Sequence, residues 1–548
     1  MEAVSSKVDS HIHSVLSHRN ALRHIDPDKH LKDEDLLKQI GYKQELRRHY
    51  TIFETFGISF SIMSLLPSIA SILPILLSSG LLGAWLSWFV ASFFIFLVGC
   101  GLSFLGSAIP TSGGLYYYTN YFCPESIRVP LSFLIGCANT LGLSAGTCAI
   151  NYGFAVEVLS AVFIQRDGDF EITDAKLYGL FAACVVSNIV IASLATKQAA
   201  RLQAISVYLN LFLIALFVIA VPIGYSKNNK FNSKELIFSD LTNFREWPIG
   251  WSVCLSLQGA VWVIGAFDSV IHCSEECKNP QQAVAWGILG SIGACGVFGV
   301  AIVSVCVACI KDGNVQRVLE SSTGSAMAQI IYDALGKQWS VAFMALIALG
   351  QYFMSTSIVI AVSRQAWSFA RDDGLPIIYN WVKYVDPRIK VPVRATIFVG
   401  GLCLSLGLLV FIGPAGANAL FSLTICSNNL AWMMPTLMIL LPYGRKKFVP
   451  GPFWFGKPLS YTIMTAGVSW MIFVMGLSLF PDNIKVDKET MNYTVVINVG
   501  MWILSLTYYF LHGHKKYSGP KSNLEDEDEF AEGSSVIMVE EVYAETKV

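Results

Sequence analysis

Two apolar stretches of the chain contain helix-breaking residues, and the second also contains ionisable ones. The first reads FGISFSIMSLLPSIA, from Phe56 to Ala70, and the second reads AVWVIGAFDSVIHCSEE, from Ala260 to Glu276. Backbone that leaves a helix inside a bilayer survives only where it lines a protein cavity, because lipid offers no hydrogen bonds. An unwound stretch exposes N–H groups at one half-helix end and C=O groups at the other. Such a pair of ends could hold a carboxylate together with a cationic amine.

Asp268 is the residue in these stretches whose chemistry is most constrained. An ionisable side chain inside a membrane span is costly and is functional by default, and Gly265 comes three residues earlier. Asp268 could pair with a substrate amine, cycle a proton, or form a structural ion pair or helix-end contact, and these three roles stay open. Glu275 and Glu276 follow, and we expect them to pair with Arg or Lys. His272 could also titrate near physiological pH.

The composition indicates a membrane protein. The chain has 548 residues, of which 54% are hydrophobic and 14% are charged, whereas a soluble domain has about 25% charged residues. The net charge of −1 gives no field that would attract nucleic acid. The cysteines lie singly, and the CxxC formed by Cys306 and Cys309 sits inside an apolar run, so we expect no metal and no cofactor. No catalytic constellation lies in the apolar runs, so we do not expect an enzyme.

About twelve apolar runs have the length of roughly 20 residues that a bilayer span requires. They cover 52–77, 82–107, 129–163, 177–196, 202–225, 250–273, 283–310, 339–370, 392–412, 415–442, 459–480 and 490–512. We therefore expect an all-α membrane protein with a transmembrane unit at 52–512 and polar tails at 1–51 and 513–548. Most Lys and Arg fall on the inner side if the N-terminus is cytosolic, so both tails are expected in the cytosol.

The two helix-breaking stretches fall in the first and the sixth run. Runs one to five and six to ten then form two five-helix units, at about 52–225 and 250–442, with extra helices in 459–512. Because five is odd, the second unit is inverted relative to the first. Broken helices at corresponding positions of two such halves mark a binding site near the middle of the membrane.

Several longer motifs resemble the amino acid–polyamine–organocation superfamily, and within it the fungal GABA permeases of the amino acid/choline branch. The likeness runs from about residue 40 to residue 524. The motifs are IGYKQELRRHY (40–50), FSIMSLLPSIAS (60–71), IPTSGGLYYYT (109–119), IGAFDSVIHCSEECKNP (264–280), AVSRQAWSFARDDGLP (361–376), ALFSLTICSNNLAW (419–432) and TMNYTVVI (490–497). The patterns SEExxNP and SRxxxxFARDxGLP are typical of the superfamily, and GYKQEL and NNLAW are more specific to the branch.

The resemblance implies a LeuT-like fold of two inverted five-helix repeats plus two extra helices. It also implies that backbone amides at the first break, placed at 60–62, bind the substrate carboxylate. Asn151 stands in AINYG where the family reads SIDYG, and Ser64 stands where it reads Gly, so the substrate range could differ. The implied substrate-binding residues are Ser59, Phe60, Ser61, Ile62 and Ser64 at the first break, Ile264, Gly265, Ala266, Phe267 and Asp268 at the second, and Asn151 in the third run.

We therefore expect a secondary active transporter for GABA and related small amino acids or amines. The resemblance implies coupling to protons. We expect the protein in a lipid bilayer, either the plasma membrane or the vacuolar membrane, and from the net charge we expect no nucleic-acid partner. Choline or polyamines are the alternative substrates, and they differ from GABA in having no carboxylate. A nutrient sensor built on a transporter fold is the other alternative, although the tails are short for such a role.

Overall fold

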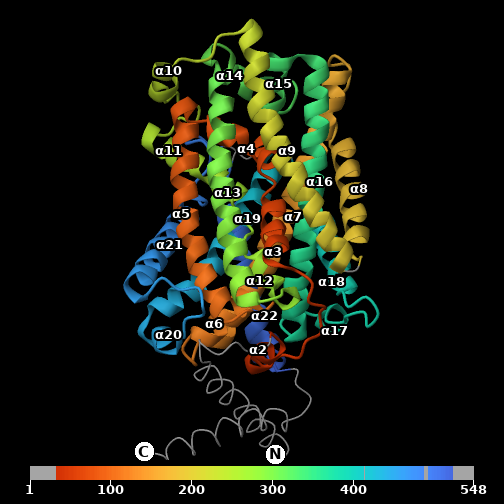
Figure 1. Ribbon diagram of the computed structural model, residues 1–548, viewed down its shortest axis with the longest axis vertical. Coiled ribbons are helices and arrows are strands. Elements are labelled where there is room, and N and C mark those ends of the chain that lie inside the picture. The colour runs from red at the N-terminus through yellow and green to blue at the C-terminus, as the bar shows by residue number, and fades with distance from the viewer. Residues whose placement is uncertain (1–32, 195, 413, 487–490, 523–548) are drawn as a thin grey trace, which may run out of the picture.

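The computed structural model describes residues 33–194, 196–412, 414–486 and 491–522 (Figure 1). Nine helical segments in these ranges are long and apolar enough to cross a membrane, and three shorter apolar helices cover Ile249–Val263, Val393–Gly407 and Val495–Leu511. Each of these segments falls within or overlaps an apolar run identified in the sequence. The described chain is therefore an all-helical, multi-pass membrane protein, as predicted.

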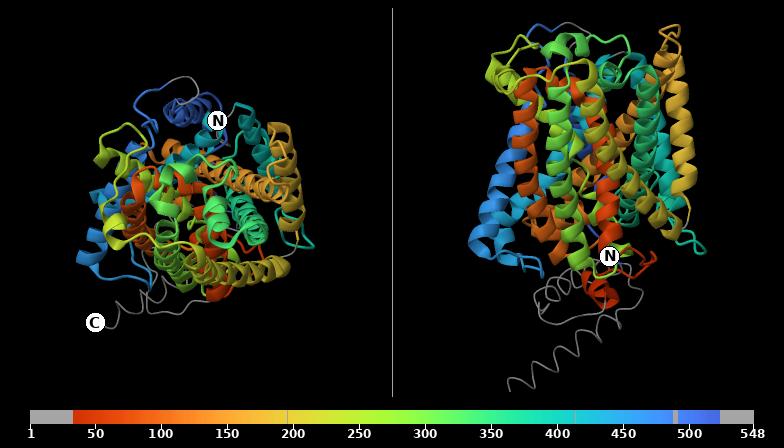
Figure 2. Two further views of the ribbon diagram at one scale, coloured as in Figure 1. Left: turned by 90° about the horizontal axis from the view of Figure 1, so that it is seen from above. Right: turned by 45° about the horizontal axis from the view of Figure 1, so that its top comes forward.

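The long helices run side by side along the longest axis of the molecule, as two further views also show (Figure 2). They are α3 (Ile52–Met63), α4 (Leu65–Leu77), α5 (Gly80–Ala108), α7 (Arg128–Gln165), α8 (Asp174–Ala192), α9 (Thr196–Asn228), α11 (Ile249–Val263), α13 (Pro280–Ala308), α16 (Lys337–Arg371), α18 (Val393–Gly407), α19 (Pro414–Leu440), α21 (Lys457–Leu477) and α22 (Gly500–Leu511). Large apolar side chains such as Phe93, Val190 and Val297 are exposed, as expected for surfaces that face lipid.

Short helices cover the two ends of the bundle (Figure 1). One end carries α2 (Asp33–Ile40), α6 (Gly114–Phe122), α17 (Tyr379–Val382) and α20 (Pro442–Lys447), and we call it the α2 end. The opposite end carries α10 (Lys234–Ser239), α14 (Val315–Leu319) and α15 (Ala326–Leu335), and we call it the α15 end. The loop after α16 and the loop between α9 and α11 thus lie at opposite ends.

The first broken helix consists of α3 and α4, which are separated by Ser64 in a left-handed conformation at φ 32° and ψ 69°. The break predicted at 60–62 was therefore placed too early. Its position follows from Pro67, which has no N–H to donate to the carbonyl of Met63. The hydroxyl of Ser68 donates to that carbonyl instead, at 2.6 Å.

The second broken helix consists of α11 and the single turn α12 (Ser269–His272), separated by the irregular segment 264–268. The break predicted there is confirmed. Ala266 has a positive φ of 55°. A Cβ atom at Gly265 would lie only 2.9 Å from the carbonyl oxygen of Trp262, so the tight turn requires glycine at this position. The short helix η2 (Ser274–Glu276) follows α12 directly.

Candidate functional site

A cavity lies between the two broken helices. Its walls come from α3, α7, α11, the segment 264–268, α16 and α19. The lining residues are Ile62, Gly146, Ile150, Val261, Trp262, Val263, Gly265, Ala266, Met354, Ile358, Thr424, Ile425, Asn428, Asn429 and Trp432. Most of this lining is apolar, and its polar side chains come mainly from α19. Such a cavity suits a small ligand whose middle is apolar.

Of the predicted site residues, three line the cavity: Ile62, Gly265 and Ala266. Ser59 and Ser61 turn toward neighbouring helices instead. The hydroxyl of Ser59 accepts a hydrogen bond of 2.8 Å from a serine of α13, and that of Ser61 donates to a carbonyl of α9 at 3.4 Å. These two hydroxyls therefore hold α3 within the bundle.

Other predicted residues also make contacts outside the cavity. Ser64 donates to the side chain of Asn210 at 2.9 Å, and Phe60 stacks on Phe56 one turn earlier. Asn151 accepts a hydrogen bond of 3.1 Å from Asn188 of α8. The change from Asp to Asn in this motif thus lies among polar side chains between α7 and α8.

Helix α4 begins at Leu65, three residues after Ile62. No side chain in the described part of the chain caps this terminus. The N-terminus of a helix carries partial positive charge and unpaired amides, and it favours an anion. The break therefore places an anion-binding group beside the cavity wall.

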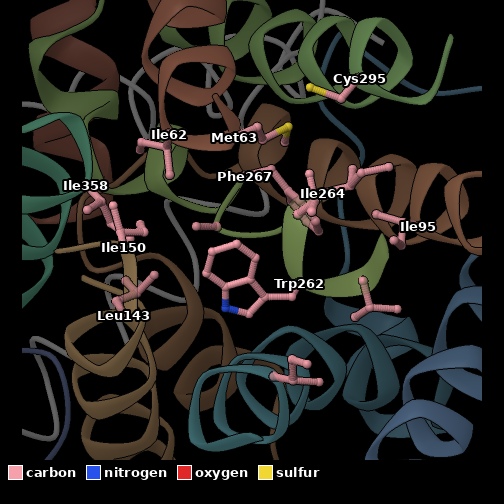
Figure 3. Packing of buried hydrophobic residues seen from close by; sticks show 14 of the residues in the cluster. Ile62, Met63, Ile95, Leu143, Ile150, Trp262, Ile264, Phe267, Cys295 and Ile358 are labelled. Carbon is pink, nitrogen blue, oxygen red and sulfur yellow. The ribbon is translucent and has the colours of Figure 1, made fainter. Parts of the chain in front are cut away.

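Trp262 occupies the centre of the apolar packing around the second break, with Ile150, Ile264 and Ile358 around it (Figure 3). Its ring lines the central cavity and also a second cavity toward the α15 end. That second cavity is lined by Ile75, Leu255, Gln258, Trp262, Ala419, Phe421, Ser422, Ile425, Phe480, Asp482, Met491, Asn492 and Tyr493. Trp262 thus stands between the two spaces.

Asp268 is fully buried at the end of the second break. Its Oδ2 accepts a hydrogen bond of 2.9 Å from the amide of Asn139 on α7 and lies 3.5 Å from Nε2 of His272. Its Oδ1 has no hydrogen-bond partner within the described residues. One carboxylate oxygen of Asp268 therefore lacks a donor in the described part of the chain, and Asp268 is not among the residues that line the cavity.

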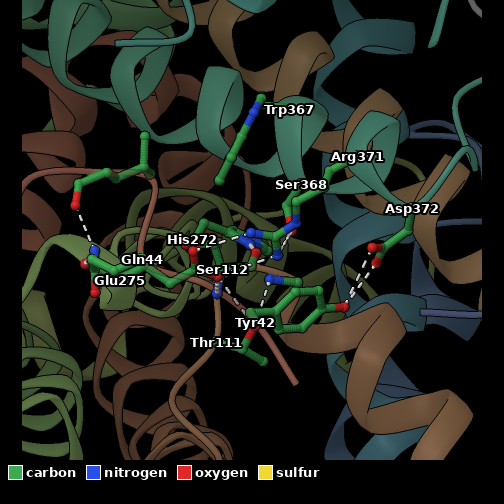
Figure 4. A network of polar contacts seen from close by, with 12 residues as sticks. Tyr42, Gln44, Thr111, Ser112, His272, Glu275, Trp367, Ser368, Arg371 and Asp372 are labelled. Carbon is green, nitrogen blue, oxygen red and sulfur yellow. Dashed lines mark hydrogen bonds and ion pairs between the residues drawn. The ribbon is translucent and has the colours of Figure 1, made fainter. Parts of the chain in front are cut away.

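Two buried ion pairs fix the segment that follows α12. Nη1 of Arg371 lies 3.2 Å from Oε2 of Glu275, and Nε of Arg364 lies 2.8 Å from Oε1 of Glu276. The expected pairing of both glutamates is thus confirmed. Ser112, in the turn between α5 and α6, also donates its N–H to Glu275 at 3.0 Å. These contacts join η2 to α16 and to the α5–α6 turn (Figure 4).

The residues before the first span pack against the same network (Figure 4). The guanidinium of Arg371 lies over the ring of Tyr42, 4.0 Å from its centroid. The hydroxyls of Tyr42 and Tyr116 donate to Asp372 at 3.1 and 2.7 Å. Burial raises the pKa of Asp372 to about 6. Side chains from distant parts of the sequence thus close the α2 end of the bundle.

Comparison with known proteins identifies the class of this bundle. Residues 50–502 match the amino acid permease family. The chain is 45% identical to the GABA-specific permease of Saccharomyces cerevisiae over 524 residues, which are 95% of this chain and 91% of the yeast protein. The chain belongs to the amino acid permease family. The transporter class expected from the sequence is therefore confirmed.

Other relatives are similar to this permease over most of their own length. An uncharacterized amino-acid permease of Schizosaccharomyces pombe is 31% identical over 90% of this chain and 87% of the relative. A putative polyamine transporter of Candida albicans is 28% identical over 94% of each protein. Both likenesses cover the two broken helices.

Glu157 of the permease was not among the predicted site residues. It lies in α7, fully buried, and its Oε1 is 3.5 Å from the hydroxyl of Ser71 on α4. Its Oε2 has no hydrogen-bond partner in the part of the chain that the structure describes. The signal was present in the sequence, because Glu157 is the acidic residue of the apolar run 129–163.

Proposed function

We propose that this permease is a secondary active transporter that takes up GABA and related small amino acids together with protons. The observation that carries the proposal is the arrangement of the two broken helices about one cavity. One break leaves the N-terminus of α4 without a side-chain cap from the described residues, and the carboxylate of Asp268 lies at the end of the other, fully buried and next to the cavity-lining segment rather than in the lining itself. A zwitterion has one group of matching charge for each.

The carboxylate of the substrate would bind at the first break, through the backbone amides that begin α4. Ile62 lines the cavity beside this break. Binding through backbone needs no Arg or Lys in the cavity, and none is among its lining residues. A permanent cation would hold the carboxylate too tightly for release, whereas amides and a helix dipole contribute more modestly.

The amine of the substrate would bind Oδ1 of Asp268, the oxygen without a partner within the described residues. Ile150, Ile358 and Ile425 lie in the wall of the cavity. GABA separates its two charged groups by three methylene groups, and this apolar wall would cover them. The name of the yeast relative, a GABA-specific permease, supports the same substrate.

The proposed topology has twelve spans, made from the nine long segments and the three shorter apolar helices. The transmembrane unit covers 52–512, with LeuT-like inverted repeats at about 52–225 and 250–442 and α21 and α22 as extra helices. The α2 end would face the cytosol, because α20 carries Arg445, Lys446 and Lys447. The tails 1–51 and 513–548 would then be cytosolic, in a plasma or vacuolar membrane.

The competing substrates are polyamines and choline, and the name of the Candida albicans relative, a putative polyamine transporter, favours the first of them. These cations would use Asp268 but leave the N-terminus of α4 without a ligand. Uptake of labelled GABA in yeast that lacks its own permeases separates the two proposals. Unlabelled GABA should compete strongly, and putrescine and choline should compete weakly. Strong competition by putrescine, with little GABA uptake, would replace the proposal with polyamine transport.

A further inference from the structure

We propose that the coupling proton binds between His272 and Asp268, and that Ser112 transmits its presence to the ion pair that closes the α2 end. This inference rests on the proposed proton-coupled uptake and names the site of the proton. Asp268 then uses one oxygen for the amine of the substrate and the other for the proton site.

The hydrogen bond of His272 to the backbone fixes its tautomer. Nδ1 of His272 lies 3.0 Å from the carbonyl oxygen of Ser112. A carbonyl oxygen can only accept, so Nδ1 carries a hydrogen. In the neutral ring Nε2 is then an acceptor. It has no hydrogen-bond partner among the described residues, and it lies 3.5 Å from Oδ2 of Asp268. Two lone pairs would face each other unless one proton lies between them.

No permanently charged side chain balances the negative charge of Asp268 beside His272. The charged groups near α12 on the elements packed against it are Glu275 and Glu276 from η2, and Arg364 and Arg371 from α16. These four form two ion pairs with one another. Lys337 stands at the opposite end of α16, where it pairs with Asp167. The sequences of α5 and α13 contain no charged residue. Within the described residues, no Arg or Lys lies within ion-pair distance of Asp268, so a proton is the cation, besides the substrate amine, that the site can take.

The remaining titratable groups around α12 do not supply a positive charge for Asp268. Glu54 of α3 lies at the exposed start of that helix, in a capping box with Thr51. The buried hydroxyl of Tyr50 and the thiols of Cys273 and Cys277 are neutral when protonated. Glu157 is 18 residues beyond Asn139 along α7, about 27 Å away at the rise of an α-helix. The two buried acids of the spans therefore form separate sites.

Ser112 connects the proton site to the closure of the α2 end. Its carbonyl accepts from His272, and its N–H donates to Oε1 of Glu275 at 3.0 Å. Glu275 in turn holds Arg371. Loss of the proton leaves His272 and Asp268 repelling each other, and the movement that relieves this repulsion pulls on the bond between Ser112 and Glu275. The proton enters with the substrate and leaves with it when the α2 end opens.

The test uses the full-length protein in proteoliposomes and two assays. The first measures uptake of labelled GABA driven by a pH gradient, and the second measures exchange of GABA without a gradient, over a range of pH. H272N keeps a donor for the carbonyl of Ser112, and H272Q keeps a donor for Asp268. Neither variant has a ring nitrogen that can share the proton with Asp268. E157Q is the matched control, because it removes the other buried acid.

We expect both His272 variants to exchange GABA within about threefold of the wild type, while gradient-driven accumulation disappears and exchange loses its pH dependence. E157Q should still accumulate GABA. Accumulation by either His272 variant at the wild-type ratio, or loss of accumulation in E157Q alone, would overturn the inference. Loss of exchange, or of folded protein, in both His272 variants would also overturn the inference. If His272 serves only to hold the proton, at least one of H272N and H272Q should fold and exchange GABA.

The GABA exchange and accumulation of the wild-type protein distinguish failure of this inference from failure of the proposed function. Wild-type protein that neither exchanges nor accumulates GABA would refute the substrate and leave the proton site to be decided with another substrate. The same variants would then be assayed with putrescine, the alternative from the yeast competition. Loss of gradient-driven accumulation with retained exchange would support the proton site for that substrate, and unchanged accumulation would reject it.

Discussion

Trp262 packs edge-on against Phe421 of α19, with their ring centroids 4.9 Å apart. Phe421 lines the cavity toward the α15 end, whereas Trp262 lines that cavity and the central one. The two rings therefore form a partition between the central cavity and the α15 end. The ion pairs after α12 close the α2 end. The aromatic partition and the ion pairs thus lie on opposite sides of the central cavity.

Removal of the partition should impair transport. F421A leaves a gap that water can enter, so the central cavity loses its closure toward the α15 end. We expect uptake of GABA to fall by about tenfold or more at an unchanged amount of protein in the membrane, since closure sets many transport and catalytic rates. F421Y keeps an aromatic ring and should retain most of the uptake. Equal uptake by F421A and the wild type would remove Phe421 from the gate.

Substitutions of Ser64 should depend on the backbone conformation that they permit. At φ 32° a β-branched residue is strained by about 1 to 3 kcal/mol, whereas glycine is not. S64V also loses the hydrogen bond to Asn210. We therefore expect S64G to transport GABA and S64V to show lower thermal stability and little uptake. Thermal unfolding and uptake, measured on both variants, check this order, and S64V behaving like S64G would contradict it.

The pair formed by Arg371 and Glu275 should show strong energetic coupling. Removal of one partner from a buried ion pair leaves an unpaired charge and costs about 3 to 5 kcal/mol. E275Q and R371Q should each lower the stability of the detergent-solubilised protein. The double variant E275Q/R371Q should lose less than the sum of the two single losses. Strict additivity in a double-mutant cycle would show that the two side chains do not interact.

Asp372 should make stability depend on pH. Burial raises its pKa to about 6 from an ordinary value of 3.8, so the folded protein holds this proton more tightly than the unfolded chain. The resulting stability is present below about pH 4 and is lost as the pH rises through about 6, by about 1 to 3 kcal/mol. Between pH 4 and pH 7 the wild type should therefore lose more thermal stability than D372N. An equal loss in both proteins would show that Asp372 does not titrate in this range.

The second break could be predicted from the sequence, whereas the position of the first could not. Gly265 and Asp268 lie in one apolar run and mark the irregular segment directly. In the first run, several Gly, Ser and Pro residues compete, and the prediction put the break at 60–62, with Ser64 beside it rather than at its centre. The deciding factor was the missing N–H of Pro67 together with the hydroxyl of Ser68, a contact that depends on the folded geometry.

The walls of the cavity were harder to predict than its two ends. Met354 and Ile358 of α16 line it, yet in the sequence they resemble any apolar residues of a membrane span. Ser61 was predicted at the site because it lies in the predicted break, and Ser59 because it lies beside that break. The rotation of α3 turns both hydroxyls toward other helices. Helix rotation is set by packing between helices, which a single sequence does not record.

The central claim is that Asp268 binds the amine of the substrate, and it is tested most directly by ligand binding to purified protein. The affinities of GABA and of butyrate, which lacks the amine, are compared in the wild type and in D268N. Loss of a buried charge pair costs about 2 to 5 kcal/mol, so GABA should bind D268N at least about thirtyfold more weakly. Butyrate should bind both proteins weakly and alike. Equal GABA affinity in the wild type and D268N would contradict the account.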